Sequence, residues 1–139
     1  MKTSVKARKI GATIIDIFTF SLLVRIIWFS GYQLSVPAGI FLIASLIIGG
    51  TITYVFVPLK LNKQTLGMKV NGLIFCFTKR NTGKIALVLT VRFFSQFFLN
   101  IIFLGSPLAI NLFFLLWRKD GMTMIDKLFS RVMMNQELD

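Results

Sequence analysis

Two opposite charges stand inside apolar segments that are long enough to enter a bilayer. Asp16 lies within KIGATIIDIFTFSLLVRIIWF (residues 9–29), and Arg92 lies within the apolar block 85–117. A lone charge at the centre of a membrane helix costs roughly 2.5–3.5 kcal/mol on insertion scales, so each of these side chains needs a partner. Asp16 and Arg92 could form an ion pair. Alternatively, the carboxylate of Asp16 could take up and release a proton as part of a path for ions.

Helical rise places the two charges at nearly the same depth. Asp16 follows Lys9 by seven residues and Arg92 follows Lys84 by eight, which puts both about 10–12 Å below the same boundary. We therefore expect Asp16 and Arg92 to face each other. The pair would be either a structural clamp between two helices or part of a route for an ion or solute.

Further polar residues share the helix faces of these two charges. Arg92, Gln96 and Asn100 recur at four-residue intervals, and Lys9 lies on the face of Asp16. Polar groups in an apolar helix face protein or water rather than lipid. The stripe therefore predicts either a polar cavity or hydrogen bonds between helices.

A second acid, Asp126, lies near the end of the chain. Thr123-x-x-Asp126 has the spacing of a helix capping box, where an acid also interacts favourably with the positive start of the helix. An equally open alternative places Asp126 in a shared site at the cytoplasmic side.

The sequence contains no constellation for catalysis or for metal binding. It has no histidine and one cysteine, Cys76. It also lacks a Gly-x-Ser-x-Gly motif, a phosphate-binding glycine loop and a pair of acids within one segment. We expect a protein that is not an enzyme and that uses no cofactor and no metal.

The elements that position these residues are membrane segments. Of 139 residues, 55% are hydrophobic and 15 are Phe, and the mean hydropathy is +0.78. Soluble domains are about 45–50% apolar, without blocks of this length. Four segments are expected: 10–29, 38–58, 85–104 and 107–117. The last two form a hairpin that turns at GSP (Gly105–Pro107), and its second arm is short. In the second segment, the small residues Ser45 and Gly49 allow another helix to approach closely.

The cations gather between the apolar blocks. There are 16 Lys and Arg against 5 Asp and Glu, for a net charge of +11. They flank the N-terminus, the middle loop and the tail, whereas the 30–37 link and the GSP turn carry none. Basic segments stay inside, so we expect a multi-pass protein of the cytoplasmic membrane with both termini in the cytoplasm. The expected partners are the lipid bilayer and its anionic headgroups, not nucleic acid. Arg25, near the outer end of the first span, is expected to extend to the headgroups.

The middle loop and the tail complete the predicted fold. Within the cytoplasmic loop 59–84, GLIFCF favours a strand or an interfacial segment. Over 123–134, one helical face gathers apolar side chains and predicts an amphipathic interfacial helix: Ile125, Leu128, Phe129, Val132 and Met133. We predict an all-α membrane protein with about four transmembrane or re-entrant helices, a short strand-like cytoplasmic loop and a C-terminal amphipathic interfacial helix. It forms one domain over 1–134, with 135–139 as a tail.

Three stretches of the sequence have the character of motifs: KIGATIID in the first span, NKQTLGMKVNGL in the middle loop and DGMTMIDKLF near the end. In this order they resemble the first-helix motif, the loop motif and the C-terminal aspartate motif of the RDD family, which comprises small bacterial integral membrane proteins named for an arginine and two aspartates. Arg92 falls where such proteins commonly carry an arginine, and the resemblance covers residues 8–134. The loop motif is the most specific. The resemblance implies a cytoplasmic motif made of Gln64, Thr65, Gly67, Lys69 and Asp126.

The sequence departs from the family pattern at three positions. Lys9 stands where an arginine is usual, Ile125 replaces a histidine, and Arg131 replaces a threonine. Both acids are kept, so the expected fold is unaffected. A proton-transfer role that depends on the histidine is weakened.

The resemblance implies transport of a small ion or solute, including cation–proton exchange, for some members and an accessory or regulatory part for others. In a transport protein, Asp16 would titrate, Arg92 and Lys9 would tune it, and Gln96 and Asn100 would line the route. Four short segments enclose little volume, so a transporter of this size is expected to be a homo-oligomer. In the alternative, the chain is a non-transporting accessory, regulatory or immunity protein that acts through a membrane-protein partner.

Overall fold

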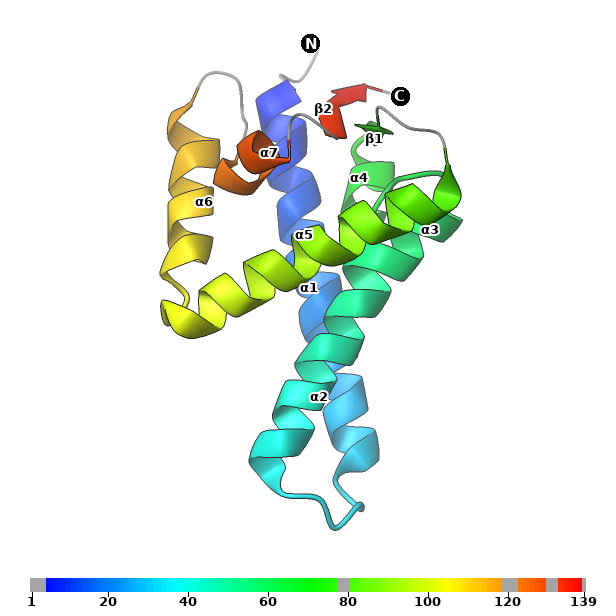
Figure 1. Ribbon diagram of the computed structural model, residues 1–139, viewed down its shortest axis with the longest axis vertical. Helices are drawn as coiled ribbons and strands as arrows, with labels where there is room; N and C mark the ends of the chain where they lie inside the picture. Colours follow the sequence, from blue (N-terminus) through cyan, green and yellow to red (C-terminus); the bar gives the residue numbers. More distant parts are fainter. Residues whose placement is uncertain (1–4, 78–80, 119–122, 130–132, 139) are drawn as a thin grey trace.

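The structure is a computed structural model that describes residues 5–77, 81–118, 123–129 and 133–138. Figure 1 shows long tilted helices with a small sheet at one end. In chain order the elements are α1 (Val5–Gly31), α2 (Ala38–Thr51), the π-helical segment η1 (Ile52–Phe56), α3 (Val57–Lys60), α4 (Leu66–Val70), β1 (Leu73–Phe77), α5 (Thr82–Ile102), α6 (Ser106–Trp117), α7 (Met124–Leu128) and β2 (Met133–Leu138). Arg131 and Val132, which were used above, lie outside the described residues, and so do four of the cations that flank the apolar blocks: Lys2, Lys79, Arg80 and Lys119.

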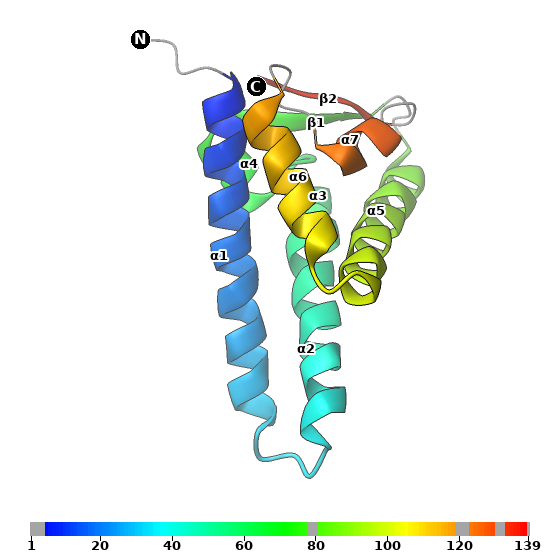
Figure 2. The same ribbon diagram turned by 90° about the vertical axis from the view of Figure 1, so that its left-hand side faces the viewer.

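Among the described residues, three helices are long and apolar enough to cross a membrane: α1, the continuous rod Ala38–Lys60 and α5. The fourth apolar helix, α6, has 12 residues and is shorter. The predicted all-α membrane fold is therefore confirmed. Leu104 and Gly105 have φ values of 51° and 83°, which turn the chain sharply between α5 and α6. Figures 1 and 2 show this turn near the middle of the long axis, well short of the loop that joins α1 to α2.

Helix α1 and the rod Ala38–Lys60 pack closely through small residues. Ser45 is fully buried, and a Cβ atom added to Gly49 would lie 2.9 Å from Cγ2 of Val24 on α1. A larger side chain at either position would separate the helices, so the predicted close approach is confirmed.

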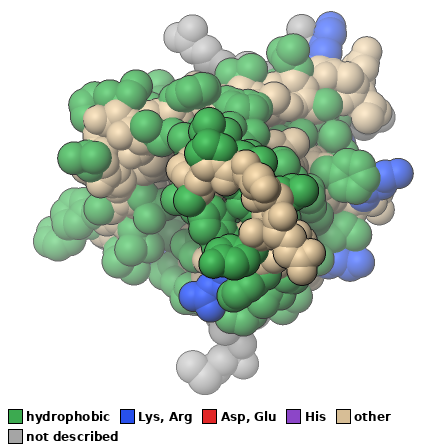
Figure 3. Space-filling model, turned by 90° about the horizontal axis from the view of Figure 1, so that it is seen from below, with side chains coloured by type: hydrophobic (Ala, Val, Ile, Leu, Met, Phe, Trp, Pro, Cys, Tyr) green, Lys and Arg blue, Asp and Glu red, His purple; other side chains and the backbone are tan. Residues whose placement is uncertain are grey.

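The two ends of the molecule differ in structure and charge. One end, here called the sheet end, holds α4, β1, β2, α7 and the first residues of α1 (Figure 1). The opposite end, here called the loop end, is the link between α1 and α2. Seen from the loop end, the surface is mostly hydrophobic, with few basic side chains and no acidic one in view (Figure 3). Most of the described Lys and Arg residues belong to elements that meet at the sheet end. These residues are Lys6, Arg8, Lys9, Lys60, Lys63, Lys69, Lys84, Arg118 and Lys127.

The tail differs from the predicted interfacial helix over 123–134. The helix α7 stops at Leu128, and Met133–Leu138 forms β2, which pairs antiparallel with β1. The predicted strand in GLIFCF is confirmed as β1. A strand needs a neighbour for its backbone N–H and C=O groups, and the end of the chain supplies it. The prediction of a longer helix, and of a separate tail at 135–139, was therefore wrong.

The core lies at the sheet end, where the loop between α3 and α5 folds back onto the helices. Its buried side chains come from α1, η1, α4, β1 and α5: Ala12, Val55, Met68, Leu73, Phe75, Ile85 and Leu89. This packing fixes the position of the loop motif against the first span.

Candidate functional site

Asp16 binds the loop that follows α3. Its side chain is 7% exposed, and its carboxylate accepts hydrogen bonds from the Thr65 hydroxyl (2.6 Å) and the Gly67 backbone N–H (2.8 Å). Thr65 is also the N-cap of α4, because its hydroxyl oxygen accepts from the Met68 N–H at 3.2 Å. The acid therefore satisfies donors at the start of α4, and α4 is held against α1.

The rest of the QTLG sequence supports this arrangement. Gln64 is buried and donates from Nε2 to the Leu73 carbonyl at 3.0 Å, which ties the loop to β1. Gly67 lies so close to α1 that a Cβ atom there would be 2.1 Å from the Ala12 carbonyl oxygen. Lys69 is exposed on α4. Thr65 and Gly67 of the loop motif thus contact the first helix, whereas Gln64 ties the loop to β1.

Removal of the Thr65 hydroxyl should weaken this clamp. We expect Thr65→Val to lower the free energy of unfolding by about 2–3 kcal/mol, because a charged acceptor loses a donor and α4 loses its cap. Thr65→Ser should retain most of the stability. The matched control is Thr19→Val, whose hydroxyl donates only to the Ile15 carbonyl of its own helix. Thermal unfolding in detergent would measure all three, and equal losses in Thr65→Val and Thr19→Val would contradict the assignment.

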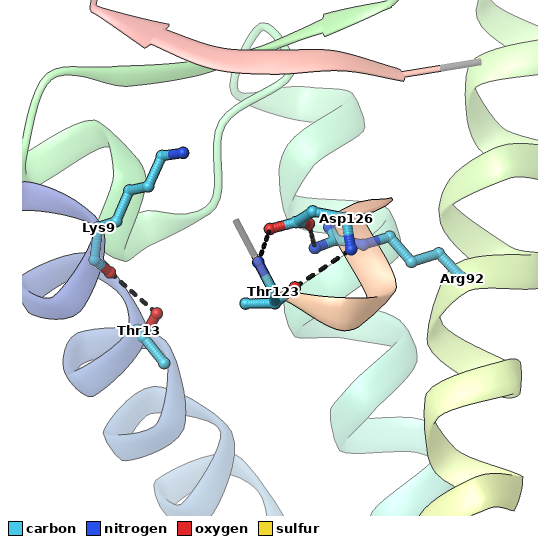
Figure 4. A network of polar contacts seen from close by, with 5 residues as sticks. All are labelled: Lys9, Thr13, Arg92, Thr123 and Asp126. Carbon is cyan, nitrogen blue, oxygen red and sulfur yellow. Dashed lines mark hydrogen bonds and ion pairs between the residues drawn. The ribbon is translucent and has the colours of Figure 1, made fainter. Parts of the chain in front are cut away.

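Arg92 pairs with Asp126. Nη2 of Arg92 on α5 lies 2.5 Å from Oδ1 of Asp126 on α7, and the two side chains are 19% and 12% exposed (Figure 4). The guanidinium also lies over the Phe75 ring of β1, 5.2 Å from its centroid. Asp126 completes a capping box with Thr123: the Asp126 N–H donates to the Thr123 hydroxyl at 3.1 Å, and the Thr123 N–H donates to the carboxylate at 3.3 Å. The predicted capping box of Asp126 is therefore confirmed, and the same carboxylate also pairs with Arg92, which was not predicted.

The predicted pairing of Asp16 with Arg92 was wrong. In the described structure Asp16 is held by Thr65 and Gly67, and Arg92 by Asp126. Counting residues along each helix predicted how deep each charge lies, but not the direction in which its side chain points around the helix. Two segments outside the long helices, α4 and α7, fold in and supply the partners.

The polar stripe on α5 also has a structural role. Asn100 donates from Nδ2 to the Gln96 carbonyl at 2.8 Å and accepts from the Leu108 N–H of α6 at 2.9 Å. Asn100 therefore joins α5 to the first turn of α6, in agreement with the hydrogen-bonding alternative. Gln96 is partly buried on the same helix.

Lys9 is buried on the same face of α1 as Asp16, with 6% of its surface exposed. Figure 4 shows its side chain leaving α1 on the side that faces Arg92 and Asp126. One turn further along, the Thr13 hydroxyl donates to the Lys9 carbonyl at 2.9 Å. The first helix thus presents a cation, a hydroxyl and an acid to the interior of the protein.

The arrangement of one arginine and two aspartates, each tied to a particular loop or helix, agrees with the comparison with known families. The model of the RDD family matches residues 3–130. The chain belongs to the RDD family. Comparison with curated proteins and with solved structures returns no match.

In this RDD-family chain, the structure adds one polar residue that the sequence arguments missed. Asn111 lies on α6, is 8% exposed, and its Oδ1 has no hydrogen-bond partner among the described residues. Nε of Arg92 is likewise buried and unbonded there. An asparagine inside the apolar helix SPLAINLFFLLW is the same signal that drew attention to Gln96 and Asn100.

Two buried polar atoms of this RDD-family protein lack a hydrogen-bond partner among the described residues, Arg92 Nε and Asn111 Oδ1. Buried polar atoms are nearly always hydrogen-bonded, so an unbonded donor and an unbonded acceptor leave binding capacity for a guest or for water. Within the described residues, no three His, Cys, Asp or Glu side chains form a group that could hold a metal ion.

Proposed function

We propose that this RDD-family protein carries a small ion or solute across the cytoplasmic membrane. The observation that supports the proposal is that two polar atoms buried in helices of a membrane protein, Arg92 Nε on α5 and Asn111 Oδ1 on α6, have no hydrogen-bond partner among the described residues. An unpartnered buried polar group costs about 1–3 kcal/mol, and a site that binds a polar guest recovers this cost.

The geometry places Asn111 near the height of Lys9. The Lys6 ammonium donates to the Leu116 carbonyl, so the start of α1 lies beside the end of α6. The two helices run in opposite directions (Figure 2), and Lys9 and Asn111 lie three and five residues below these contact points. At about 1.5 Å per residue, both are roughly 5–8 Å below that contact. Lys9 and Asn111 therefore lie at about the same level of the protein.

The proposed orientation puts the sheet end in the cytoplasm. Most of the described cations belong to elements of that end, and basic segments are retained inside. Arg25, exposed toward the loop end of α1, would reach the outer headgroups. In this orientation Lys9 and Asn111 lie in the cytoplasmic half of the protein.

The role proposed for Asp16 changes with its contacts. A carboxylate that already accepts two hydrogen bonds from a loop is suited to anchoring that loop. We assign solute contact instead to Lys9, Arg92 and Asn111, with Asp126 as the counter-ion of the arginine.

A second candidate function is that of an accessory or regulatory membrane protein. One observation favours it: Asp16 and Asp126 both hold segments of the sheet end in place, which requires no solute. The same contacts would shape a surface for a membrane-protein partner.

Flux through proteoliposomes separates the two. We expect imposed Na⁺, K⁺ or pH gradients to drive uptake that Asn111→Leu reduces about tenfold or more, a loss of at least 1.4 kcal/mol of solute interaction. The same substitution removes an unbonded buried acceptor, so its thermal stability should equal or exceed that of the parent. Arg25→Gln is the control for charge and should retain flux. Absence of flux with all three gradients, together with a membrane protein that co-purifies in mild detergent, would reject transport in favour of the accessory role.

A further inference from the structure

An open apolar groove runs between α5 and α7. Its volume is about 530 Å³, within the usual range of ligand pockets. The described residues that line the groove are Ser95, Phe98, Leu99, Ile102, Ile125, Leu128 and Phe129. Among these seven, Ser95 alone has a polar side chain.

The groove follows one face of each helix. On α5 its lining positions, 95, 98, 99 and 102, are spaced at three and four residues, and on α7 they are 125, 128 and 129. The start of α7 is held to α5 by the Arg92–Asp126 pair, and Ile125, which lines the groove, precedes Asp126. The groove therefore begins beside the ion pair and continues along α5 toward the α5–α6 turn.

Polarity changes along the groove in the way it changes across one leaflet of a bilayer. Arg92 lies three residues before Ser95 on the same face of α5, and beyond Ser95 the lining is wholly apolar as far as Ile102. Because α5 is long and apolar enough to span a membrane, the medium around its far half is hydrocarbon. An occupant with a polar head and an apolar tail fits this gradient.

We propose that this groove is a binding site for an anionic phospholipid, with one acyl chain lying against α5 and the headgroup at the level of α7. Charge complementarity supports an anionic headgroup: the chain has a net charge of +11, and exposed Lys127 is the neighbour in sequence of Leu128, which lines the groove. Lysine near an anionic membrane surface contributes about 1 kcal/mol. The inference goes beyond the proposed function and does not depend on transport.

The site is tested with a tryptophan reporter in the full chain. In a background where Trp28 and Trp117 are replaced by Phe, Leu128→Trp places the reporter in the groove, and Phe113→Trp places a control on α6. The native side chains at the two positions are 64% and 56% exposed, and Phe113 does not line the groove. Detergent-purified protein is titrated with phosphatidylglycerol that carries a dibrominated acyl chain, which quenches nearby tryptophan.

We expect quenching of the groove reporter to saturate near one lipid per protein, at about tenfold lower lipid concentration than half-quenching of the control. Ser95→Phe, which fills the groove, should remove this difference. Phosphatidylcholine with the same chain should bind about fivefold more weakly, by the contribution of one lysine near the surface.

Several results would overturn the proposal. Quenching that rises in parallel for the two reporters, without saturation, would mean that lipid contacts the protein non-specifically. Retention of the difference in Ser95→Phe would place the lipid elsewhere, and the smaller Ser95→Val gives the same test if the Phe variant does not fold. Equal binding of the two lipids would remove the anionic headgroup from the proposal, and a dimer formed through this face would make a second copy the occupant.

Discussion

Gly67→Ala is expected to destabilise the protein by about 3–5 kcal/mol, because overpacking and a lost charged hydrogen bond act together. The added Cβ would lie 2.1 Å from the Ala12 carbonyl oxygen and 2.8 Å from its carbonyl carbon. Both belong to the backbone of α1, so no side-chain rotation can relieve the clash. If α4 shifts instead, the Gly67 N–H leaves the Asp16 carboxylate, from which it now lies 2.8 Å.

The matched control for this substitution is Gly39→Ala. Nothing lies within 4 Å of a Cβ atom at Gly39, which is near the start of α2. Alanine is about 1 kcal/mol better than glycine within a helix, so this variant should unfold at an unchanged or higher temperature. Thermal unfolding in detergent and the yield of monodisperse protein would measure both. Equal stability of the two variants would mean that α4 does not pack on α1 as described.

The long elements could be predicted from the sequence because lipid imposes simple constraints on them. A span must be apolar over about 20 residues, and its backbone must be satisfied internally. These constraints located α1, the rod from α2 to α3, and α5 to within a few residues at most boundaries. They also indicated that residues 107–117 are short for a crossing, as 12-residue α6 confirms. The close contact between α1 and α2 could also be predicted, because the small residues Ser45 and Gly49 allow it locally.

The partners of the charged residues could not be predicted in the same way. Depth follows from counting residues, whereas direction depends on how the short segments α4 and α7 pack. Asp16 is satisfied by a backbone N–H, and every loop residue except proline carries such a donor. Its position becomes specific only when Gly67 lets the loop approach α1. The family motif marked these loop residues, and the contacts explain why they are needed.

The end of the chain shows a second limit. Apolar residues at 125, 128, 129, 132 and 133 fit a helical face, but the last of them belongs to β2. Backbone pairing with β1, from Leu73 opposite Leu138 to Phe77 opposite Met133, decides the structure there. A strand of six residues is too short for its side-chain pattern to predict this backbone pairing. The structure thus joins the segment between α4 and α5 to the C-terminal segment in one small sheet, which lies above the Arg92–Asp126 pair in Figure 4.

The Arg92–Asp126 ion pair gives the second large expected effect on stability. Arg92→Ala should lower the free energy of unfolding by about 3 kcal/mol, because a mostly buried carboxylate loses its counter-ion. Asp126→Ala should cost about 1 kcal/mol more, since the capping box with Thr123 is lost as well. Thermal or denaturant unfolding of detergent-purified protein would measure both. Arg25→Ala, at an exposed position on α1, removes the same side chain and should change stability by less than about 0.5 kcal/mol.

The double variant decides whether the two side chains act through each other. If the ion pair is the main interaction of both, Arg92→Ala combined with Asp126→Ala should cost about 2 kcal/mol less than the two single changes added together. Removing both charges leaves neither one buried and unpaired, which is the physical reason for the difference. Strict additivity would mean that Arg92 is stabilised chiefly by its position over Phe75 and Asp126 chiefly by Thr123, so that α7 is held to α5 by packing rather than by charge.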